Sequence, residues 1–509
     1  MKLVTKAIPA WPKLAWVARW AAGADTIEVL HGPMVETAEN WCAEAVWAGD
    51  FACGDFDRTD LVFGTGVRCH DDHAVFVSSG STLDRLWYIQ DSGRCCVSNS
   101  LPALLAVTGL SLCEDHDYAE GFKSICEGLV NYKRSFPAQP GEIRLVYFNN
   151  LRYDGTGLAE TEKPDVAPPF SSFSEYFGFL VGAAKALADN MNAPGRSHRP
   201  VPLASVSSGY DSTAAAMIAR YAGCADAVTF RQSTSLWRGS DAGTDIAAQL
   251  GLSCREYDRT SETYPLEETI WAVVGRPGVL NWTLFDYPEP LCCFFTGCHG
   301  DKVWDRTEEE LPDPFAIPSV ADLGIGEFRL LKGIFHCPVP FWGIRHVRDI
   351  RALAFAPEMA PWTIHNGYDR PIARRIAEEG GIARGTFAHR KKNTSTEAVF
   401  LWPYSRKAAE SFTAYLRRQG AYVPSPALVR LLRHVTRLDQ LISENLLARV
   451  RLDFRLRYKM RFRANSLLFQ WANSELKALY RQGLDPAEAT IGHTRSSHCR
   501  DGPGNVVGQ

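Results

Sequence analysis

Short runs of alternating hydrophobic and polar residues fill the first third of the chain, and Gly, Asp and Ser separate them. Such alternation between turn-forming residues is typical of β-strands. The predicted strands are Ala74–Ser78, Arg85–Ile89, Cys95–Ser98 and Ile143–Asn149. Residues 100–108 predict a helix that begins after the N-cap residue Ser100. We therefore expect an α+β sandwich over residues 1–164, the N-terminal region.

The pattern changes after a proline-rich joint at Pro164–Pro169, which predicts an extended linker. Beyond a helix pattern at 171–190, strand patterns alternate with helix patterns. The alternating segments are 201–206, 211–221, 227–230 and 244–250. Because this alternation is typical of a parallel sheet covered by helices on both faces, we expect a doubly wound α/β domain over residues 170–425, the central region.

Residues 426–509, the C-terminal region, have a helical pattern that gives way to a tail at residue 492. Between Arg430 and Arg481 there are 12 Lys or Arg residues and 4 Asp or Glu residues. One interpretation is a solvated helical surface. The second interpretation is a docking face for an acidic peptide, a nucleic acid or a protein.

The composition of the 509 residues narrows the class of protein. At about 150 residues per domain, this length predicts two to four domains. The 55 Lys and Arg residues nearly balance the 58 Asp and Glu residues, and a net charge of −3 excludes a chain that coats nucleic acid. No apolar run approaches the roughly 18 residues of a membrane span. With no secretory signal visible and 14 Cys residues, we expect reduced thiols and a cytoplasmic protein without membrane contact.

The most informative motif follows the predicted strand at 201–206. It contains Ser207, Ser208, Gly209, Tyr210, Asp211, Ser212 and Thr213, and a helix pattern follows at once. Small residues let the backbone fold tightly around an anion, while successive N–H groups and a helix N-terminus point towards it. A carboxylate such as Asp211 suits a phosphate site when Mg²⁺ shares that site. The alternative is a serine-rich N-cap turn without a ligand.

This motif resembles the Ser-Gly-Gly-x-Asp-Ser loop of the ATP pyrophosphatases, with Ser208 in place of a glycine. A second motif, Phe294–Trp304, resembles the Gly-x-Gly-Gly-Asp segment of asparagine synthetases, with Gly297 and Gly300 at glycine positions and His299 replacing a glycine. The resemblance implies that both segments bind ATP. It also implies that Asp211 and Asp301 bind Mg²⁺.

Two further segments follow in the family's order. Residues 339–341 and 345–355 resemble a Pro-Phe turn that leads into a substrate-side helix. Residues 368–375 and 387–392 resemble the helix and basic stretch of β-lactam and carbapenam synthetases. The resemblance implies that Lys392, or Lys391 if the register differs by one, is the catalytic lysine that stabilises the α-phosphate and a developing oxyanion. The basic triplet taken alone favours a solvated loop.

The N-terminal region resembles the Ntn-type glutaminase domain of asparagine synthetases in its segments 93–105 and 140–142. That family uses Cys at position 2 as its nucleophile, whereas this chain has Lys2, and its first cysteine is the internal Cys42. An internal thiol lacks the free α-amine that serves as the base. We therefore expect a degenerate glutaminase domain, as in β-lactam synthetases and lasso-peptide cyclases, and a substrate that supplies its own amine.

The β-lactam synthetases use a Tyr–Glu pair as a base, and the matching positions here are Cys298 and His336. This difference argues against β-lactam formation. His336 could accept a proton from an amine, and Cys298 could assist it or be an inert buried thiol. A structural zinc is not favoured, because the adjacent Cys292 and Cys293 point to opposite faces of a strand and the chain has no Cys-x-x-Cys pair.

The resemblance therefore implies an ATP- and Mg²⁺-dependent ligase that adenylates a carboxylate, releases pyrophosphate and joins the acyl group to an amine. The substrate could be a peptide, a small molecule or a protein N-terminus. A lasso-type macrolactam cyclase is a narrower version of this hypothesis. Two competing hypotheses are a catalytically inactive scaffold and a tRNA- or nucleobase-modifying ATP pyrophosphatase.

Overall fold

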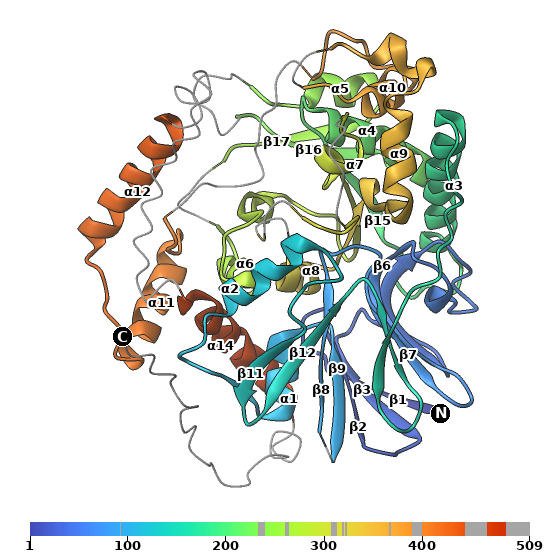
Figure 1. The fold of residues 1–509 in the computed structure, drawn as a ribbon. Helices are drawn as coiled ribbons and strands as arrows, with labels where there is room; N and C mark the ends of the chain where they lie inside the picture. The colour runs from blue at the N-terminus through green and yellow to red at the C-terminus, as the bar shows by residue number, and fades with distance from the viewer. Residues whose placement is uncertain are drawn as a thin grey trace, which may run out of the picture.

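Two β-sheets lie against each other in the N-terminal region (Figure 1). The structure, a computed structural model, describes residues 1–91, 93–232, 240–259, 264–306, 313–317, 320, 323–365, 368–388, 400–442 and 466–484. The first sheet has the strand order β1-β3-β2-β9-β8-β12-β11-β10 and is antiparallel except for the pair β1 and β3. Its strands are β1 (Lys2–Ala7), β2 (Trp16–Ala21), β3 (Thr26–His31), β8 (Arg85–Gln90), β9 (Arg94–Ser98), β10 (Ser111–Leu112), β11 (Ser135–Gln139) and β12 (Glu142–Tyr147).

The second sheet is antiparallel, with the order β14-β13-β7-β6-β5-β4. Its strands are β4 (Glu36–Thr37), β5 (Trp41–Trp47), β6 (Val62–Cys69), β7 (Ala74–Val77), β13 (Asn150–Tyr153) and β14 (Leu158–Thr161). Alternate residues of both sheets, among them Trp20 and Phe76, meet in one buried cluster, and these two rings stack 5.2 Å apart. The four strands predicted from the alternating pattern are thus confirmed as β7, β8, β9 and β12, with ends shifted by one or two residues.

Helix α1 (Leu101–Thr108) lies against the outer face of the first sheet (Figure 1). Its start is fixed locally, because the Ser100 side chain accepts a hydrogen bond from the backbone N–H of Ala103. Its end is a left-handed Gly109, the usual way to terminate a helix. The predicted helix is therefore confirmed at both ends.

A parallel sheet forms the centre of the other half of the molecule, with the order β17-β16-β15-β18-β19. Its strands are β15 (Val201–Ser205), β16 (Asp226–Phe230), β17 (Ser253–Tyr257), β18 (Cys292–Thr296) and β19 (Ile334–Pro338). Adjacent residues of one strand enter different cores, since Cys292 lies in one buried cluster and Cys293 in another. Helices therefore have to cover both faces of this sheet.

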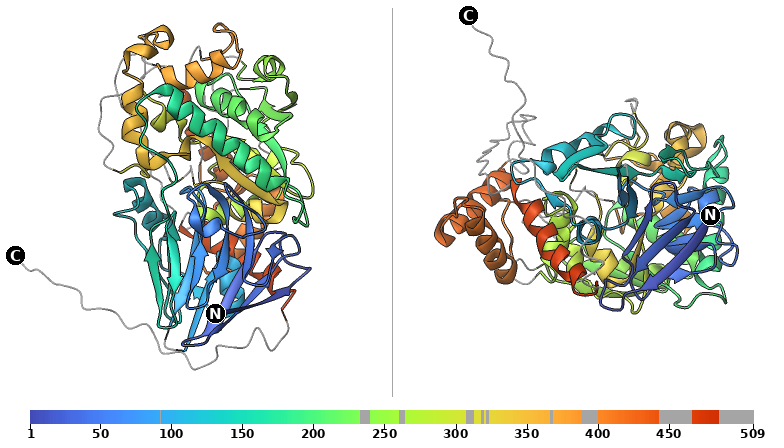
Figure 2. Two further views of the ribbon diagram at one scale, coloured as in Figure 1. Left: turned by 90° about the vertical axis from the view of Figure 1, so that its right-hand side faces the viewer. Right: turned by 90° about the horizontal axis from the view of Figure 1, so that it is seen from below.

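The helices divide between these two faces. One face packs against α3 (Phe173–Met191), α4 (Tyr210–Ala219), α9 (Val347–Leu353) and α10 (Pro371–Glu379), and the other against α6 (Glu267–Val274) and α8 (Gly326–Lys332). The shorter helices of the described chain include α2 (Tyr118–Phe122), α5 (Thr244–Gln249) and α7 (Gly300–Val303). The structure therefore confirms the expected α/β architecture with a parallel sheet. Figure 2 shows α3 crossing beside that sheet, with the N-terminal sheets below it.

The C-terminal region contributes α12 (Pro426–Ile442) and α14 (Leu468–Arg481). Helix α11 (Arg406–Arg418) packs on α14, where the rings of Phe412 and Trp471 lie 5.3 Å apart, and all three helices contribute to one buried cluster. Helix α14 also reaches the N-terminal region, where Phe469 lies 5.1 Å from the ring of Phe122. The predicted boundary at residue 425 stays a prediction, and residues 492–509 lie outside the described part.

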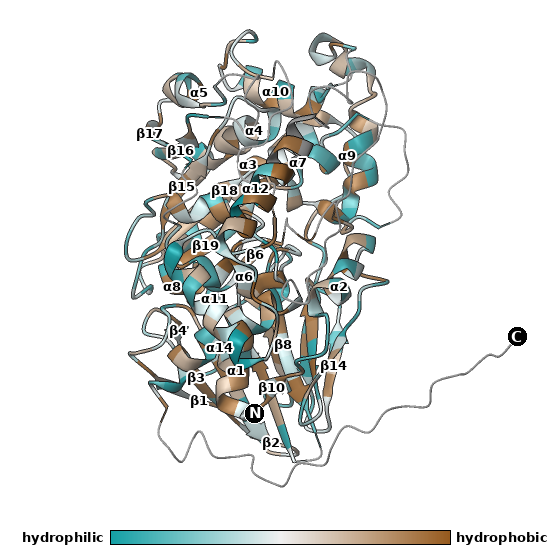
Figure 3. Cartoon of the chain, turned by 90° about the vertical axis from the view of Figure 1, so that its left-hand side faces the viewer, coloured by the Kyte–Doolittle hydropathy of each residue, from teal (hydrophilic) through white to brown (hydrophobic). Residues whose placement is uncertain are grey.

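Figure 3 shows the strands near β6 and β8 coloured as hydrophobic, while α8 and α14 carry hydrophilic residues as well.

Candidate functional site

The strand order of the parallel sheet marks one point as a natural binding site. From β15 the chain moves outwards through β16 to β17, and it then returns to the other side of β15 to form β18 and β19. The direction in which the chain crosses the sheet therefore reverses between β15 and β18, which makes this pair of strands the topological switch point. Ligands of open α/β sheets bind at such switch points. The segment after β15 contains Ser207–Thr213, and the segment after β18 contains Gly297–Asp301.

The loop after β15 is held by its own hydroxyl groups. The Ser207 and Ser212 hydroxyls lie 2.7 Å apart, and the Ser207 backbone N–H donates to the Ser212 hydroxyl at 3.1 Å. The Thr213 hydroxyl donates to the Gly209 carbonyl at 2.6 Å. Gly209 is the N-cap of α4, so the loop ends at the positive end of a ten-residue helix. The predicted tight turn into a helix is thus confirmed.

The loop after β18 packs directly on this helix start. A Cβ atom added to Gly297 would lie 2.4 Å from the backbone carbonyl carbon of Asp211. A Cβ added to Gly300 would lie 2.5 Å from the Cβ of Asp211. Glycine at both positions therefore permits an approach that no other residue allows. The fold brings the two sequence motifs together, and Asp301 follows the glycine that touches Asp211.

An arginine that the sequence analysis gave no role completes this cluster of charges. The Arg370 guanidinium forms an ion pair with Asp211 Oδ2, and its Nε lies 3.8 Å from Asp305 Oδ1. Arg370 is only 3% exposed. Burial alone would lower the pKa of Arg370, but Asp211, Tyr368 and Asp301 raise it above its ordinary value. Asp211 and Asp305 thus lie beside one buried cation, and Asp301 adds to the negative potential that acts on it.

Asp241 is a second residue that sequence reasoning missed. Its carboxylate accepts a hydrogen bond from the Ser208 hydroxyl at 2.5 Å, and its backbone carbonyl accepts one from the Ser208 N–H at 3.1 Å. Asp241 thus fixes the position of Ser208. The sequence contained no signal for this pairing, because 33 positions separate the two residues.

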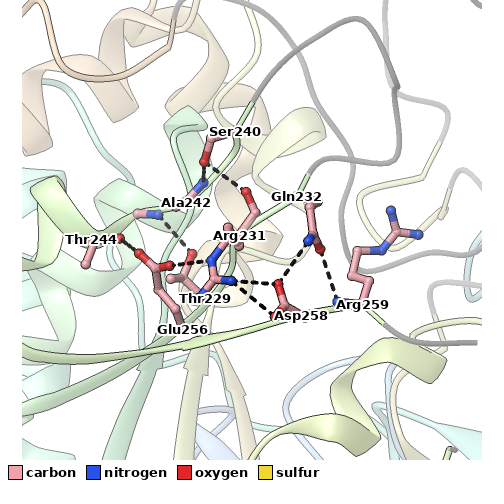
Figure 4. Close-up of polar contacts among 10 residues, drawn as sticks. Thr229, Arg231, Gln232, Ser240, Ala242, Thr244, Glu256, Asp258 and Arg259 are labelled. Atoms are coloured by element: carbon pink, nitrogen blue, oxygen red, sulfur yellow. Dashed lines mark hydrogen bonds and ion pairs between the residues drawn. The ribbon is translucent and has the colours of Figure 1, made fainter.

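A polar network flanks the site at the carboxyl ends of β16 and β17 (Figure 4). Arg231 donates to Glu256 and to Asp258, each at 3.2 Å. Gln232 donates to Asp258 at 2.9 Å, and the Ser240 hydroxyl donates to the Arg231 carbonyl at 2.8 Å. These contacts join the end of β16 to the end of β17 beside the loop that contains Ser207–Thr213.

The predicted lysines Lys391 and Lys392 lie outside the described residues. The chain before them reaches the loop after β15, because the Ala388 backbone N–H donates to the Ser208 carbonyl at 2.7 Å. Ala388 adopts a left-handed φ of 63°, which turns the chain at this contact. The last described residue of this segment therefore contacts the Ser207–Thr213 loop directly.

His336 is deeply buried on β19, and Cys298 is half-buried. His336 Nε2 lies 2.8 Å from the Thr296 hydroxyl, and its ring packs edge-on against Trp282. Burial lowers the pKa of His336 to about 4, so the imidazole is neutral and weakly basic at physiological pH. Cys298 packs between the two cores that flank the sheet. Their catalytic roles stay predictions.

His299, within the segment Gly297–Asp301, has an unusual backbone conformation and an aromatic neighbour. It adopts a left-handed φ of 73°, and its ring stacks on Phe341 at 4.4 Å. Burial lowers the pKa of His299 to about 4, and its Nε2 has no hydrogen-bond partner among the described residues. The neutral ring therefore acts as an aromatic contact between the second motif and residues 339–341, the predicted Pro-Phe turn.

Several thiols of the N-terminal region are poor nucleophiles. Burial raises the pKa of Cys42 above its ordinary value, and it raises the pKa of Cys69 and Cys95 to about 11. A thiol in this form carries little thiolate at neutral pH. Cys42, the first cysteine of the chain, lies fully buried on β5.

In the described part of the chain, no three His, Cys, Asp or Glu side chains converge in a way that could hold a metal by themselves. Nor does any described helix combine the length and the apolar character that crossing a bilayer requires.

A scan against protein-family models finds no family that matches the chain, and a search of curated proteins finds no relative of it.

Proposed function

We propose that this chain is an ATP-dependent ligase that forms an amide bond between a carboxylate and an amine, with release of pyrophosphate and AMP. In the first step a carboxylate oxygen of the substrate attacks the α-phosphorus of ATP, and the bond to the β-phosphate oxygen breaks. In the second step the amine nitrogen attacks the acyl carbon, AMP leaves, and the nitrogen loses a proton to the surroundings.

One observation supports this proposal above all others. The loop with Ser207–Thr213 and the loop with Gly297–Asp301 meet at the switch point of a parallel sheet, and Gly300 is in contact range of Asp211. The family resemblance requires these two loops to share one ligand. Nothing in the local sequence forces segments about 90 residues apart to meet, so their contact is an independent argument for a common site.

The carboxylates at this point fit Mg²⁺ bound together with a polyphosphate. Mg²⁺ is usually held by one or two protein carboxylates and by substrate phosphates and waters, not by a complete protein cage. Asp211 and Asp301 would supply the carboxylates. The N-terminus of α4 and the backbone of the Ser207–Thr213 loop would bind the phosphate oxygens. When bound, the metal would neutralise charge on the leaving pyrophosphate.

The chain's own residues would then position the reacting groups. The Ser207–Thr213 loop would hold one end of the nucleotide, and Lys392, or Lys391, would supply a cation to the reacting groups. An ammonium group there would stabilise the negative charge that develops during amine attack. The amine is proposed to come from the second substrate and not from glutamine, because Cys42 is buried and protonated.

The test supplies the purified chain with ATP, Mg²⁺ and a panel of carboxylates with hydroxylamine, a small amine that traps acyl-adenylates. We expect AMP and pyrophosphate in equal amounts, together with an acyl hydroxamate. Asp211→Asn and Asp301→Asn should each abolish the products, whereas Asp245→Asn, on α5 outside the site, should retain them. Formation of ADP and phosphate would overturn the proposal, and release of glutamate from glutamine would overturn its amine assignment.

A further inference from the structure

Arg370 pairs with Asp211, a carboxylate that the proposed function assigns to a metal. Its guanidinium is bound to Asp211 Oδ2, lies near Asp305, and sits 5.1 Å from the centre of the Tyr368 ring. The side chain is 4% exposed, while that of Asp211 is 20% exposed. The guanidinium is therefore more deeply buried than the carboxylate with which it pairs.

A free divalent cation and this guanidinium compete for one carboxylate. Like charges that share a buried partner repel each other with little screening by solvent or salt. Both cations can remain only if an anion enters with the metal and gives the guanidinium a new partner.

We propose that Arg370 is a polyphosphate-binding residue and that Asp211 is its ion-pair partner until a polyphosphate binds. The metal then enters this site together with a polyphosphate and not by itself. This inference rests on the proposed function. When the metal takes the Asp211 carboxylate, the guanidinium turns to a phosphate oxygen of the nucleotide. Arginine suits this exchange, because its planar fork binds carboxylates and phosphates with the same two-bond geometry.

The position of Arg370 in the chain supports this role. It immediately precedes Pro371, the first residue of α10, so its backbone is fixed by a helix start. Helix α10 packs on α4, and the Arg374 guanidinium donates to the Tyr210 hydroxyl at 2.6 Å. The Ser207–Thr213 loop leads into α4 and Arg370 precedes α10. Because these two helices pack together, the positions of the loop and of Arg370 relative to each other are fixed.

The experiment measures two binding constants for each variant, without substrate turnover. Mn²⁺ alone, followed by electron paramagnetic resonance, reports metal entry, and pyrophosphate with Mg²⁺, followed by calorimetry, reports polyphosphate binding. In Arg370→Gln we expect at least about tenfold tighter Mn²⁺ binding, because repulsion is removed. We expect at least about tenfold weaker binding of magnesium pyrophosphate, because a charge-assisted contact is lost.

Arg370→Lys separates charge from geometry. Its ammonium should keep the metal out as the wild type does, yet bind pyrophosphate more weakly because it lacks the fork. Arg384→Gln is the matched control. Arg384 carries the same charge as Arg370 but lies after the end of α10, where its side chain is 55% exposed and pairs with Glu378. It should change neither constant. Thermal unfolding of each variant verifies that it is folded.

The outcomes distinguish the inference from the function on which it rests. Opposite changes of the two constants in Arg370→Gln support the inference. Equal weakening of both constants in a folded variant overturns it, as does an unchanged Mn²⁺ affinity. If the wild-type chain binds no magnesium pyrophosphate, the proposed function fails, whatever the variants do with Mn²⁺.

Discussion

A Cβ atom placed on Gly300 would come within 2.5 Å of both Cβ and Cγ of Asp211. This distance is far below van der Waals contact, and Gly300 has an ordinary negative φ, so the restriction is steric and not conformational. The second motif therefore needs glycine here because an acidic side chain lies against it. This contact joins the two halves of the candidate site.

The contact predicts the effect of Gly300→Ala. The added methyl group must displace Asp211 or the β18 loop, which should reduce stability by about 1–3 kcal/mol. It should weaken binding of ATP with Mg²⁺ even in the fraction that stays folded. The control is Gly182→Ala on α3, where nothing lies within 4 Å of an added Cβ. That variant should be neutral or up to about 1 kcal/mol more stable. Calorimetric binding and thermal unfolding of both proteins check the prediction.

A buried ion network should hold the N-terminal and central regions together. Arg329 on α8 donates to both Glu44 oxygens at 2.8 and 2.9 Å, and to Asp84 at 2.7 Å. Arg329→Met would leave two carboxylates buried without their cation, which costs about 3–5 kcal/mol. Adding Glu44→Gln should recover part of that loss. Urea unfolding followed by tryptophan fluorescence tests both, and an unchanged midpoint in Arg329→Met would contradict the expectation.

Glu327 should make stability depend on pH. Burial raises its pKa to about 7, although Ser100 and Tyr480 each donate to Oε2 at 3.0 Å. Between about pH 4.5 and 7 the unfolded chain loses this proton while the folded chain keeps it. Stability therefore falls as the pH rises through that window, by about 3 kcal/mol in all, and is constant on either side.

Glu327→Gln isolates this contribution, because the amide oxygen can still accept both hydrogen bonds. The variant should match the wild type near pH 4.5 and exceed its melting temperature at pH 8. Glu410→Gln, at a solvent-exposed position, is the control and should follow the wild type at every pH. A difference between Glu327→Gln and the wild type that does not vary with pH would refute the prediction.

The lysine prediction concerns turnover and not nucleotide binding. Lys392→Ala should fold and bind ATP, yet form product at most about a hundredth as fast, because a preorganised cation acts mainly in the transition state. Lys392→Arg should recover little of this rate. If Lys391→Ala is the inactive variant instead, the catalytic lysine is Lys391, and the alignment with the synthetases is shifted by one residue. Full activity in both alanine variants would remove the proposed catalytic lysine.

Local signals in the sequence located many elements because they act over a few residues. Ser172 caps α3 through the Glu175 N–H, and the predicted start at residue 171 is off by only two positions. The alternation of strands and helices identified the parallel sheet, and the adjacent Cys292 and Cys293 do enter opposite cores. Serines, one glycine and an aspartate at the junction of a strand pattern and a helix pattern marked the loop after β15.

What the sequence could not decide is which distant segments meet. The position of β18 beside β15 follows from burial of both faces of the sheet, a non-local requirement that no short pattern contains. Arg370 was visible as one charge in a basic segment, and only packing of α10 on α4 brings it to Asp211. The sequence by itself determined the loops and their chemistry. Tertiary structure determined which of their charged groups face one another, because burial selects charge partners across the whole fold.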